Sequence, residues 1–183
     1  MRGFFLKWPI GIITVILISF SCKKDNTDTG NQSEQITTFR LTLRETGSSV
    51  TKVFEFRDVD GTGGNPPVKF DPIILSASKN YACSIEVFNE SISPSVNITP
   101  EILAEGDDHQ FYFEPAGVNI NLLNLDIDSK GLPIGLSSTW NTGAAGNGTM
   151  KITLKHKPGT KEAGDLVSKG ETDIELNFTA QVQ

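Results

Sequence analysis

One loop of the sequence carries oxygen-bearing side chains at the spacing of a calcium site. Asp58, Asp60 and Thr62 match positions 1, 3 and 5 of a calcium-binding loop, and glycine follows at position 6. An EF-hand is excluded because its twelfth position, which needs a bidentate Glu, is Lys69 here. Two interpretations stay open: a turn in which Asp and Asn side chains bind local backbone, or a weak calcium site formed by Asp58, Asp60, Thr62 and Asn65.

A second loop repeats this pattern less well. Asp126 and Asp128 hold its first and third positions, and Gly131 follows. Lys130 takes the fifth position, where calcium needs an oxygen ligand. We therefore do not expect a metal in this loop.

The run Asp107-Asp108-His109 combines carboxylates with an imidazole, which is a donor set for a transition metal. Three consecutive side chains rarely all face one ion, so the favoured interpretation is that His109 closes a strand end and bonds to backbone. His156, the other histidine, is in phase with core residues at the end of its strand and is expected to be structural too. If both histidines lay at the same end of the fold, a zinc or haem-related site would gain support.

Motifs of common hydrolase and nucleotide sites are absent from the sequence. There is no GxSxG, no HExxH and no P-loop. Of the two cysteines, Cys22 belongs to an export signal, and Cys83 is in phase with the core residues of a predicted strand, where a thiol behaves as a small apolar side chain. We therefore expect no enzymatic activity and no disulfide.

The N-terminus has the parts of a lipoprotein export signal. Two basic residues accompany an apolar run at 10–20, and Ser21 provides the small residue that precedes Cys22. The run is too short for a membrane helix, which needs roughly 20 residues. We expect residues 1–21 to be removed as a signal peptide and Cys22 to become the lipidated first residue. An ordinary secretory signal is the alternative.

The mature chain divides into a tether and one domain. Residues 22–35 comprise the lipidated cysteine and a polar segment without aliphatic or aromatic side chains, which predicts a flexible tether. Residues 36–183 then form a single domain. Loss of two positive charges with the signal changes the net charge from −6 to −8, which argues against nucleic acid as a partner. The lipid on Cys22 is the expected contact with the membrane.

Apolar and polar residues alternate along most of the domain, with the period of a half-buried strand. The clearest runs are 36–45, 50–57, 80–89, 149–156 and 173–182. Weaker strands are expected at 69–76, 109–114, 118–127 and 136–142. These eight or nine short strands, separated by Gly, Pro and Asn turns, predict an all-β fold: an antiparallel sandwich of the immunoglobulin-like kind.

Three local features refine this pattern. Pro72 suits an edge strand because proline cannot donate a ladder hydrogen bond. The alternation slips at Leu122-Leu123, which predicts a bulge or a change of partner strand. At most one short helix is expected, with Thr99 as its N-cap and Pro100 in its first position.

Five longer motifs occur in order along nearly the whole domain, behind the export signal: DVDGTGGNPP, ITPEILAEGDDHQFYF, DIDSKGLPIGL, TGAAGNGTMKITLKHKP and GETDIELNF. Together they resemble a family of small Bacteroidota lipoproteins of unknown function. Some members are described as having a type 1 periplasmic-binding fold. This sequence departs from that fold, which is a larger, two-lobed α/β structure. The resemblance implies export and lipidation and supplies no catalytic residues.

These features lead to two functional hypotheses. The first is a lipid-anchored, non-enzymatic binding or accessory module of the outer membrane, exposed at the cell surface or, failing that, on the periplasmic face. Such a module would assist a TonB-dependent transporter or another outer-membrane protein in capturing a metal, haem or glycan ligand. The alternative is a structural or adhesive envelope protein whose sandwich only makes protein–protein contacts.

Overall fold

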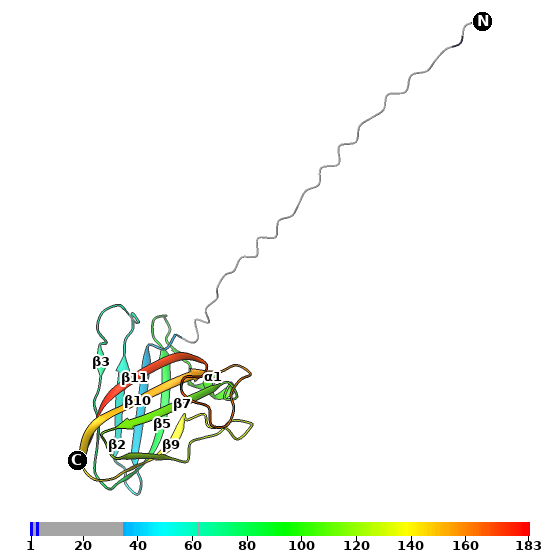
Figure 1. The fold of residues 1–183 in the computed structure, drawn as a ribbon. Helices are drawn as coiled ribbons and strands as arrows, with labels where there is room; N and C mark the ends of the chain where they lie inside the picture. The colour runs from blue at the N-terminus through cyan, green and yellow to red at the C-terminus, as the bar shows by residue number, and fades with distance from the viewer. Residues whose placement is uncertain (2, 4–34, 62) are drawn as a thin grey trace.

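The computed structural model describes residues 1, 3, 35–61 and 63–183. Within these residues two β-sheets pack face to face (Figure 1). The strands of the larger sheet are β1 (Thr38–Glu45), β2 (Thr51–Arg57), β3 (Lys69–Phe70), β5 (Asn80–Asn89), β6 (Val96–Asn97), β8 (Ile120–Leu123) and β9 (Ser137–Thr142). The smaller sheet contains β4 (Ile73–Leu75), β7 (His109–Ala116), β10 (Gly146–His156) and β11 (Glu171–Val182). Apart from residues 1 and 3, the predicted signal peptide lies outside the described residues, as do Cys22 and the tether up to residue 34.

The connectivity is that of an immunoglobulin-like sandwich. The larger sheet runs β3-β2-β1-β5-β9-β8, with β6 on β5, and the smaller runs β4-β11-β10-β7. With β1, β5, β7, β8, β9, β10 and β11 taken as strands A to G, these sheets contain the ABED and CFG orders of that fold. β4 pairs with the last strand in parallel, whereas the pairs between the other strands are antiparallel. The predicted fold is confirmed.

Strand β1 shows how the alternating sequence builds the core. Phe39, Leu41 and Leu43 are fully buried, whereas the arginines between and after them are partly or fully exposed. Across the sandwich, the ring of Trp140 in β9 meets Phe113 of β7 edge-on, with 5.9 Å between ring centroids. These inward side chains remove a large apolar area from water, which stabilises the packing of the two sheets. All of the described core therefore lies within 36–183.

Two predicted strands are shorter than the alternation suggested. The run 69–76 is divided into β3 and β4 at Asp71 and Pro72, and β4 lies at a sheet edge as the proline indicated. The run 118–127 is a strand only at Ile120–Leu123, because Asn124 has a left-handed backbone with φ of 52°. The slip in alternation therefore marks the end of β8. The part of the chain that the structure describes contains eleven strands, two of them only two residues long.

The short helix is present as α1 (Thr99–Ala104), and Pro100 lies in its first turn as expected. Thr99 does not act as the N-cap. Its hydroxyl instead accepts a hydrogen bond from the Val87 backbone N–H of β5 at 2.9 Å. The threonine is diverted because α1 packs beside β5, and the Thr99 hydroxyl bonds to the backbone of that strand.

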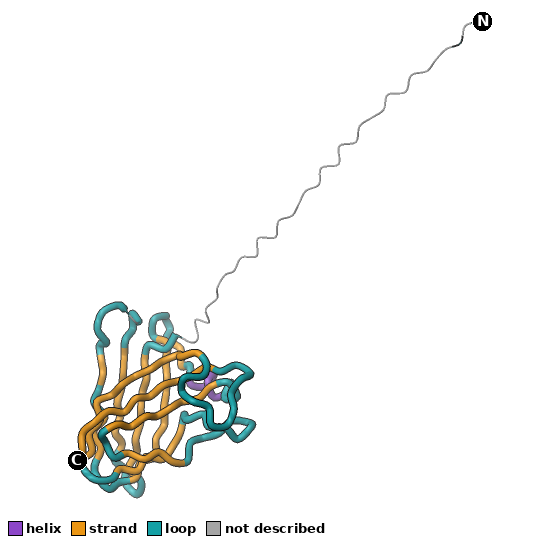
Figure 2. The backbone as a smooth tube through the Cα atoms, viewed as in Figure 1, coloured by secondary structure: helices purple, strands orange, loops and turns teal. Residues whose placement is uncertain are grey.

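The sandwich has two distinct ends. β1, β7 and β11 begin at one end, where β2, β5 and β10 finish, and α1 closes it (Figure 2). We call it the histidine end, because it holds Ile36, Asp58, Glu105, His109, His156 and Asp173. The opposite end, which we call the far end, carries the β1–β2 turn and residue Gln183. The domain therefore begins at the histidine end.

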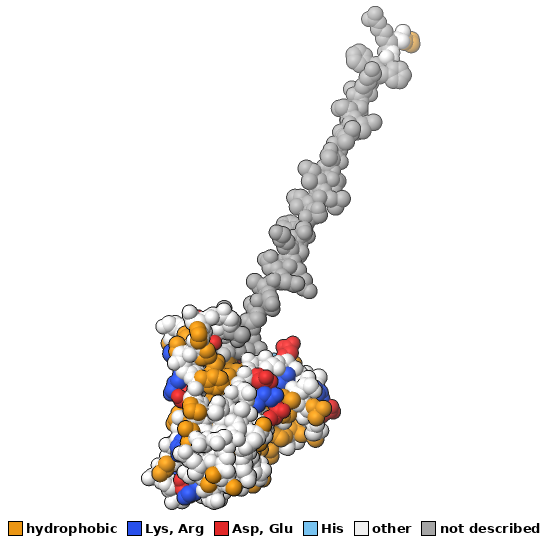
Figure 3. Space-filling model, turned by 60° about the vertical axis from the view of Figure 1, so that its left-hand side comes forward, with side chains coloured by type: hydrophobic (Ala, Val, Ile, Leu, Met, Phe, Trp, Pro, Cys, Tyr) orange, Lys and Arg blue, Asp and Glu red, His pale blue; other side chains and the backbone are white. Residues whose placement is uncertain are grey.

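The surface carries charges of both signs. On the face drawn in Figure 3, Lys and Arg side chains lie beside Asp and Glu rather than in a patch of one sign. Arg40 illustrates this arrangement, with its Nε 3.1 Å from a carboxylate oxygen of Glu55. Among the described residues, the only helix is α1, which has six residues. It lacks the length and apolar character that a helix needs to cross a bilayer.

Candidate metal centre

The two histidines, far apart in sequence, are cross-strand neighbours at the histidine end. β7 and β10 are antiparallel, and their register places His109, the first residue of β7, opposite His156, the last residue of β10. The imidazole rings are stacked, with centroids 4.5 Å apart and an interplanar angle of 4°. The register of β7 and β10 thus places both histidines at the same end of the fold, which is the arrangement that would support a metal-related site.

His109 is held in one orientation by the end of α1. Its ring is buried, and its Nδ1 lies 3.1 Å from the backbone carbonyl oxygen of Glu105. That carbonyl follows the last helical residue, where carbonyl groups lack intrahelical partners. In a neutral imidazole this contact places the proton on Nδ1 and leaves the lone pair on Nε2. The interpretation of His109 as a strand-end residue bonded to backbone agrees with this geometry.

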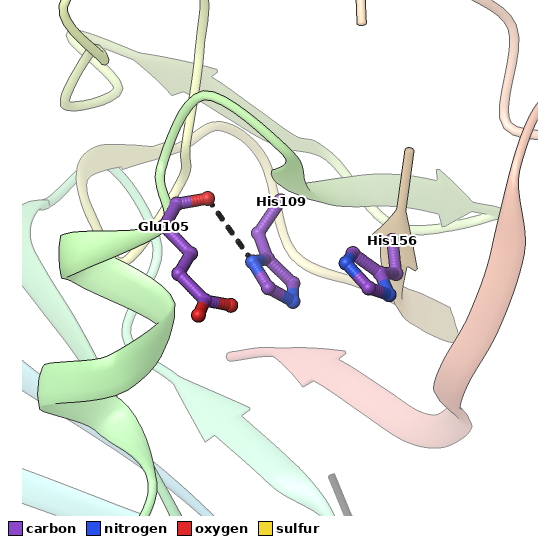
Figure 4. A group of neighbouring side chains, drawn as sticks. All are labelled: Glu105, His109 and His156. Atoms are coloured by element: carbon purple, nitrogen blue, oxygen red, sulfur yellow. Dashed lines mark hydrogen bonds between the residues drawn. The ribbon is translucent and has the colours of Figure 1, made fainter. Parts of the chain in front are cut away.

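Two carboxylates surround the imidazole pair. Glu105, His109 and His156 each offer one ligand atom, and these atoms lie within 4.8 Å of one another. His109 lies between the other two side chains (Figure 4). On the side of β11, Oδ2 of Asp173 is 3.9 Å from Nε2 of His109. Nitrogen and oxygen ligands of this kind bind borderline metal ions such as Zn²⁺.

A small cavity adjoins these groups. Its volume is about 10 Å³, and it is lined by Ile36, Ile98, Glu101, Ile102, Glu105, His109, Leu154 and Asp173. A space of this size holds about one water molecule or one ion. It does not hold haem or a sugar. A larger depression of about 280 Å³ lies beside it, and Ile36 and Asp173 line both.

The adjacent aspartates of the predicted Asp107-Asp108-His109 cluster have other partners. The Asp107 carboxylate accepts hydrogen bonds from Ser129, whose hydroxyl lies 2.8 Å from Oδ1, and these bonds lower its pKa. Oδ1 of Asp108 accepts the Gly159 backbone N–H at 2.9 Å. Only His109 of the three therefore contributes to the histidine pair.

The predicted calcium loop is organised by Asp60. Its Oδ2 accepts the backbone N–H of Asn65 at 2.9 Å and the side-chain amide of the same residue at 2.6 Å, and both bonds lower the pKa of Asp60. Burial and the neighbouring Asp60 carboxylate raise the pKa of Asp58, whose Oδ1 is buried without a hydrogen-bond partner among the described residues. Thr62 lies outside the described residues. The side-chain bonds are those of a turn, and calcium binding stays a prediction.

In the loop of Asp126 and Asp128 an ammonium group stands where a metal would bind. Nζ of Lys161 lies 2.8 Å from Oδ2 of Asp128, and both side chains are fully buried. Oδ1 of Asp128 accepts the backbone N–H groups of Lys130 and Leu132. The Lys161 ammonium therefore neutralises the carboxylate oxygen that a metal ion in this loop would use.

Cys83 is not available as a metal ligand. Its side chain is buried in β5, and burial raises the pKa of the thiol to about 12. A thiol with this pKa stays protonated at neutral pH, and the thiolate is the form that binds metals.

Comparison with protein-family models, with curated proteins and with solved structures finds no match to this chain.

Sequence reasoning missed Glu105 and Asp173. Glu105 lies in the loop between α1 and β7, before His109. Asp173 lies on β11, a strand that is not adjacent to β7. The only available signal was that both histidines fall at the ends of alternating segments, HQFYF and TMKITLKH. Their pairing depends on which strands are neighbours, and the alternation does not specify that.

Proposed function

We propose that this chain is a lipid-anchored, non-enzymatic binding module of the bacterial outer membrane, which presents the histidine end of its sandwich to a ligand. The carrying observation is a cavity at one end of the β-sandwich that is lined by His109 and by carboxylates, with the ring of His156 stacked on that of His109. Loops and connections at the end of a sandwich are the usual location of its binding residues.

The anchor part of the proposal rests on the sequence. Cys22 follows a short apolar run and a small residue, and a polar segment of thirteen residues separates it from Ile36. A flexible chain of this length has an r.m.s. span of about 20 Å. An anchored domain on such a tether has the reach to present its histidine end to an outer-membrane protein, such as a TonB-dependent transporter that takes up the ligand.

Site-specific crosslinking in the intact outer membrane tests the partner. A photo-reactive residue replaces Leu103, which is 58% exposed on α1 at the histidine end, in the full-length, lipidated chain. The matched control replaces Val50, which is 48% exposed at the far end. We expect an adduct with an outer-membrane protein from position 103 only.

The competing hypothesis, a structural or adhesive envelope protein, gives a different pattern. Adducts from both positions, or from Val50 alone, would contradict the binding module and favour a sandwich that packs through its general surface. Absence of any adduct from Leu103 would remove the outer-membrane partner from the proposal.

A further inference from the structure

We infer that the histidine end binds one divalent transition metal ion of the zinc class through His109, His156, Glu105 and Asp173. This inference rests on the proposed function, because it names the ligand of the same end of the sandwich.

The strongest geometric argument is the contact between His109 and Asp173. With the proton of His109 on Nδ1, its Nε2 lone pair faces the Asp173 carboxylate at 3.9 Å. An imidazole and a carboxylate at this distance form an ion pair, in which the shared cation is either a proton or a metal ion. The separation is too long for a hydrogen bond, which needs about 2.7–3.2 Å. It suits an ion between them, because Zn²⁺ binds nitrogen and oxygen ligands at about 2.0–2.2 Å each.

The hydrogen bond to the Glu105 carbonyl supports the same assignment. Metal-bound imidazoles almost always donate their second N–H to a carbonyl or carboxylate, which fixes the ring. His109 has this arrangement, since its Nδ1 lies 3.1 Å from a backbone carbonyl oxygen at the end of α1. The ring is also 97% buried, so its orientation is set by packing before any ion arrives.

His156 and Glu105 complete the ligand set after a small adjustment. Their ligand atoms and that of His109 lie within 4.8 Å, whereas ligands of a tetrahedral zinc ion are separated by about 3.4 Å. Parallel rings direct their lone pairs side by side, so the His156 ring must turn toward the ion. His156 is only half-buried and Glu105 is exposed, so both side chains have the freedom to move.

Charge and ligand chemistry select the class of ion. Two carboxylates and two neutral imidazoles balance the charge of one divalent cation. In the connection between β10 and β11, Lys157 pairs with Asp165 and Lys161 with Asp128. Two imidazoles favour zinc-class metals over Ca²⁺ and Mg²⁺, which prefer oxygen ligands alone.

Calorimetric titration with ZnCl₂ of residues 23–183, the mature chain without its lipidated cysteine, tests the inference. These residues contain the whole described core, and the protein is freed of any histidine tag and of metal. We expect one site per chain with a micromolar or tighter Kd, and a higher melting temperature with zinc than without it. Co²⁺ should bind competitively and give the visible absorption of a four-coordinate ion.

Matched variants locate the site. Glu105→Gln and His156→Ala change side chains that are not part of the core, and each should weaken zinc binding at least tenfold. Glu114→Gln is the control, because this carboxylate lies on the same strand as His109 but pairs with Lys151 toward the far end, and it should bind zinc as the parent does. Asp173→Asn should weaken binding as well.

Either of two results would overturn the inference. The first is no saturable zinc binding, with NMR showing protons on both nitrogens of His109 at neutral pH, so that a proton is the shared cation. The second is zinc binding that Glu105→Gln and His156→Ala leave unchanged. If zinc fails to bind but position 103 still crosslinks to an outer-membrane protein, the metal is wrong and the binding module stands.

Discussion

The sequence motif Asp107-Asp108-His109 does not form one site in the structure. His109 instead lies beside Glu105 and His156, a cluster that the sequence motif did not indicate. Its neighbours Asp107 and Asp108 bind Ser129 and a loop amide. Residues adjacent in a chain leave a strand end in different directions, whereas register brings His156 onto its ring. The residue types therefore indicated metal-ligating side chains in this region, but they did not indicate which side chains lie next to His109.

We expect the loop that contains Asp58 and Asp60 to bind calcium weakly, because it supplies only two carboxylates. We expect a Kd of about 10⁻⁴ to 10⁻³ M, the range of extracellular calcium modules. Millimolar calcium should then raise the melting temperature by about 2–4 °C. Because the pKa of Asp58 is raised, its proton competes with the ion, and the shift should shrink as the pH falls.

Differential scanning calorimetry with several millimolar CaCl₂ measures this shift. The double variant Asp58→Ala, Asp60→Ala should remove it, and Asp71→Ala, in the next strand connection, serves as the control. An unchanged melting temperature in the parent chain would mean that the loop is only a turn.

Asp165 gives the clearest pH dependence. Hydrogen bonds from the Lys169 ammonium, from a backbone N–H and from the buried Lys157 lower the pKa of Asp165 to about 2. A depressed carboxyl pKa adds stability above the unfolded value of about 4. This stability is lost as the pH falls from about 4 to about 2.

Urea unfolding across this pH range in the parent and in Asp165→Asn checks the assignment. The variant should be less stable at neutral pH and should lose less stability on acidification. Glu162→Gln, a change at a 74% exposed carboxylate, should behave as the parent does. Parallel acid dependence in the parent and Asp165→Asn would contradict the assigned role.

At the scale of elements, the strands were largely predictable and their neighbours were not. The alternation in β1 and β11 identified the inward side chains, because one face of each strand meets the core. The end of β8 and the diversion of Thr99 depended on a left-handed residue and on the backbone of β5. Local sequence does not encode such contacts between distant segments.

The long connection from β10 to β11 is fastened by an ion pair that the sequence did not reveal. Nζ of Lys161 reaches Oδ2 of Asp128 and the Gly106 carbonyl, all in the interior. Lys161→Met removes the ammonium and leaves a buried carboxylate uncompensated, so we expect a loss of about 3–5 kcal/mol of unfolding free energy.

Chemical denaturation at neutral pH measures this loss. Lys130→Met is the control, since the Lys130 ammonium is 53% exposed and its pair with Asp107 should contribute less than about 1 kcal/mol. If Lys161→Met is as stable as the control, the ion pair between Lys161 and Asp128 does not stabilise the fold.

At the scale of the whole molecule, the proposed lipid anchor on Cys22 would set the location of the domain. Cys22→Ser should abolish incorporation of labelled palmitate, because the thioether-forming side chain is lost, and should leave unprocessed precursor. Fractionation and fluorography of parent and variant cells check this expectation. Cys83→Ser is the control and should be acylated normally. Palmitate uptake by Cys22→Ser would contradict the lipoprotein assignment.

The position of a bound ion tests most directly whether the histidine end is the binding site. Crystals of residues 23–183 grown with zinc, with diffraction recorded on both sides of the zinc absorption edge, locate the metal by its anomalous signal. We expect one strong peak about 2.0–2.2 Å from both Nε2 of His109 and Oδ2 of Asp173, with the His156 ring turned toward it. Anomalous peaks only at other surface carboxylates, with the histidine rings still stacked, would contradict the assignment of this end as the site.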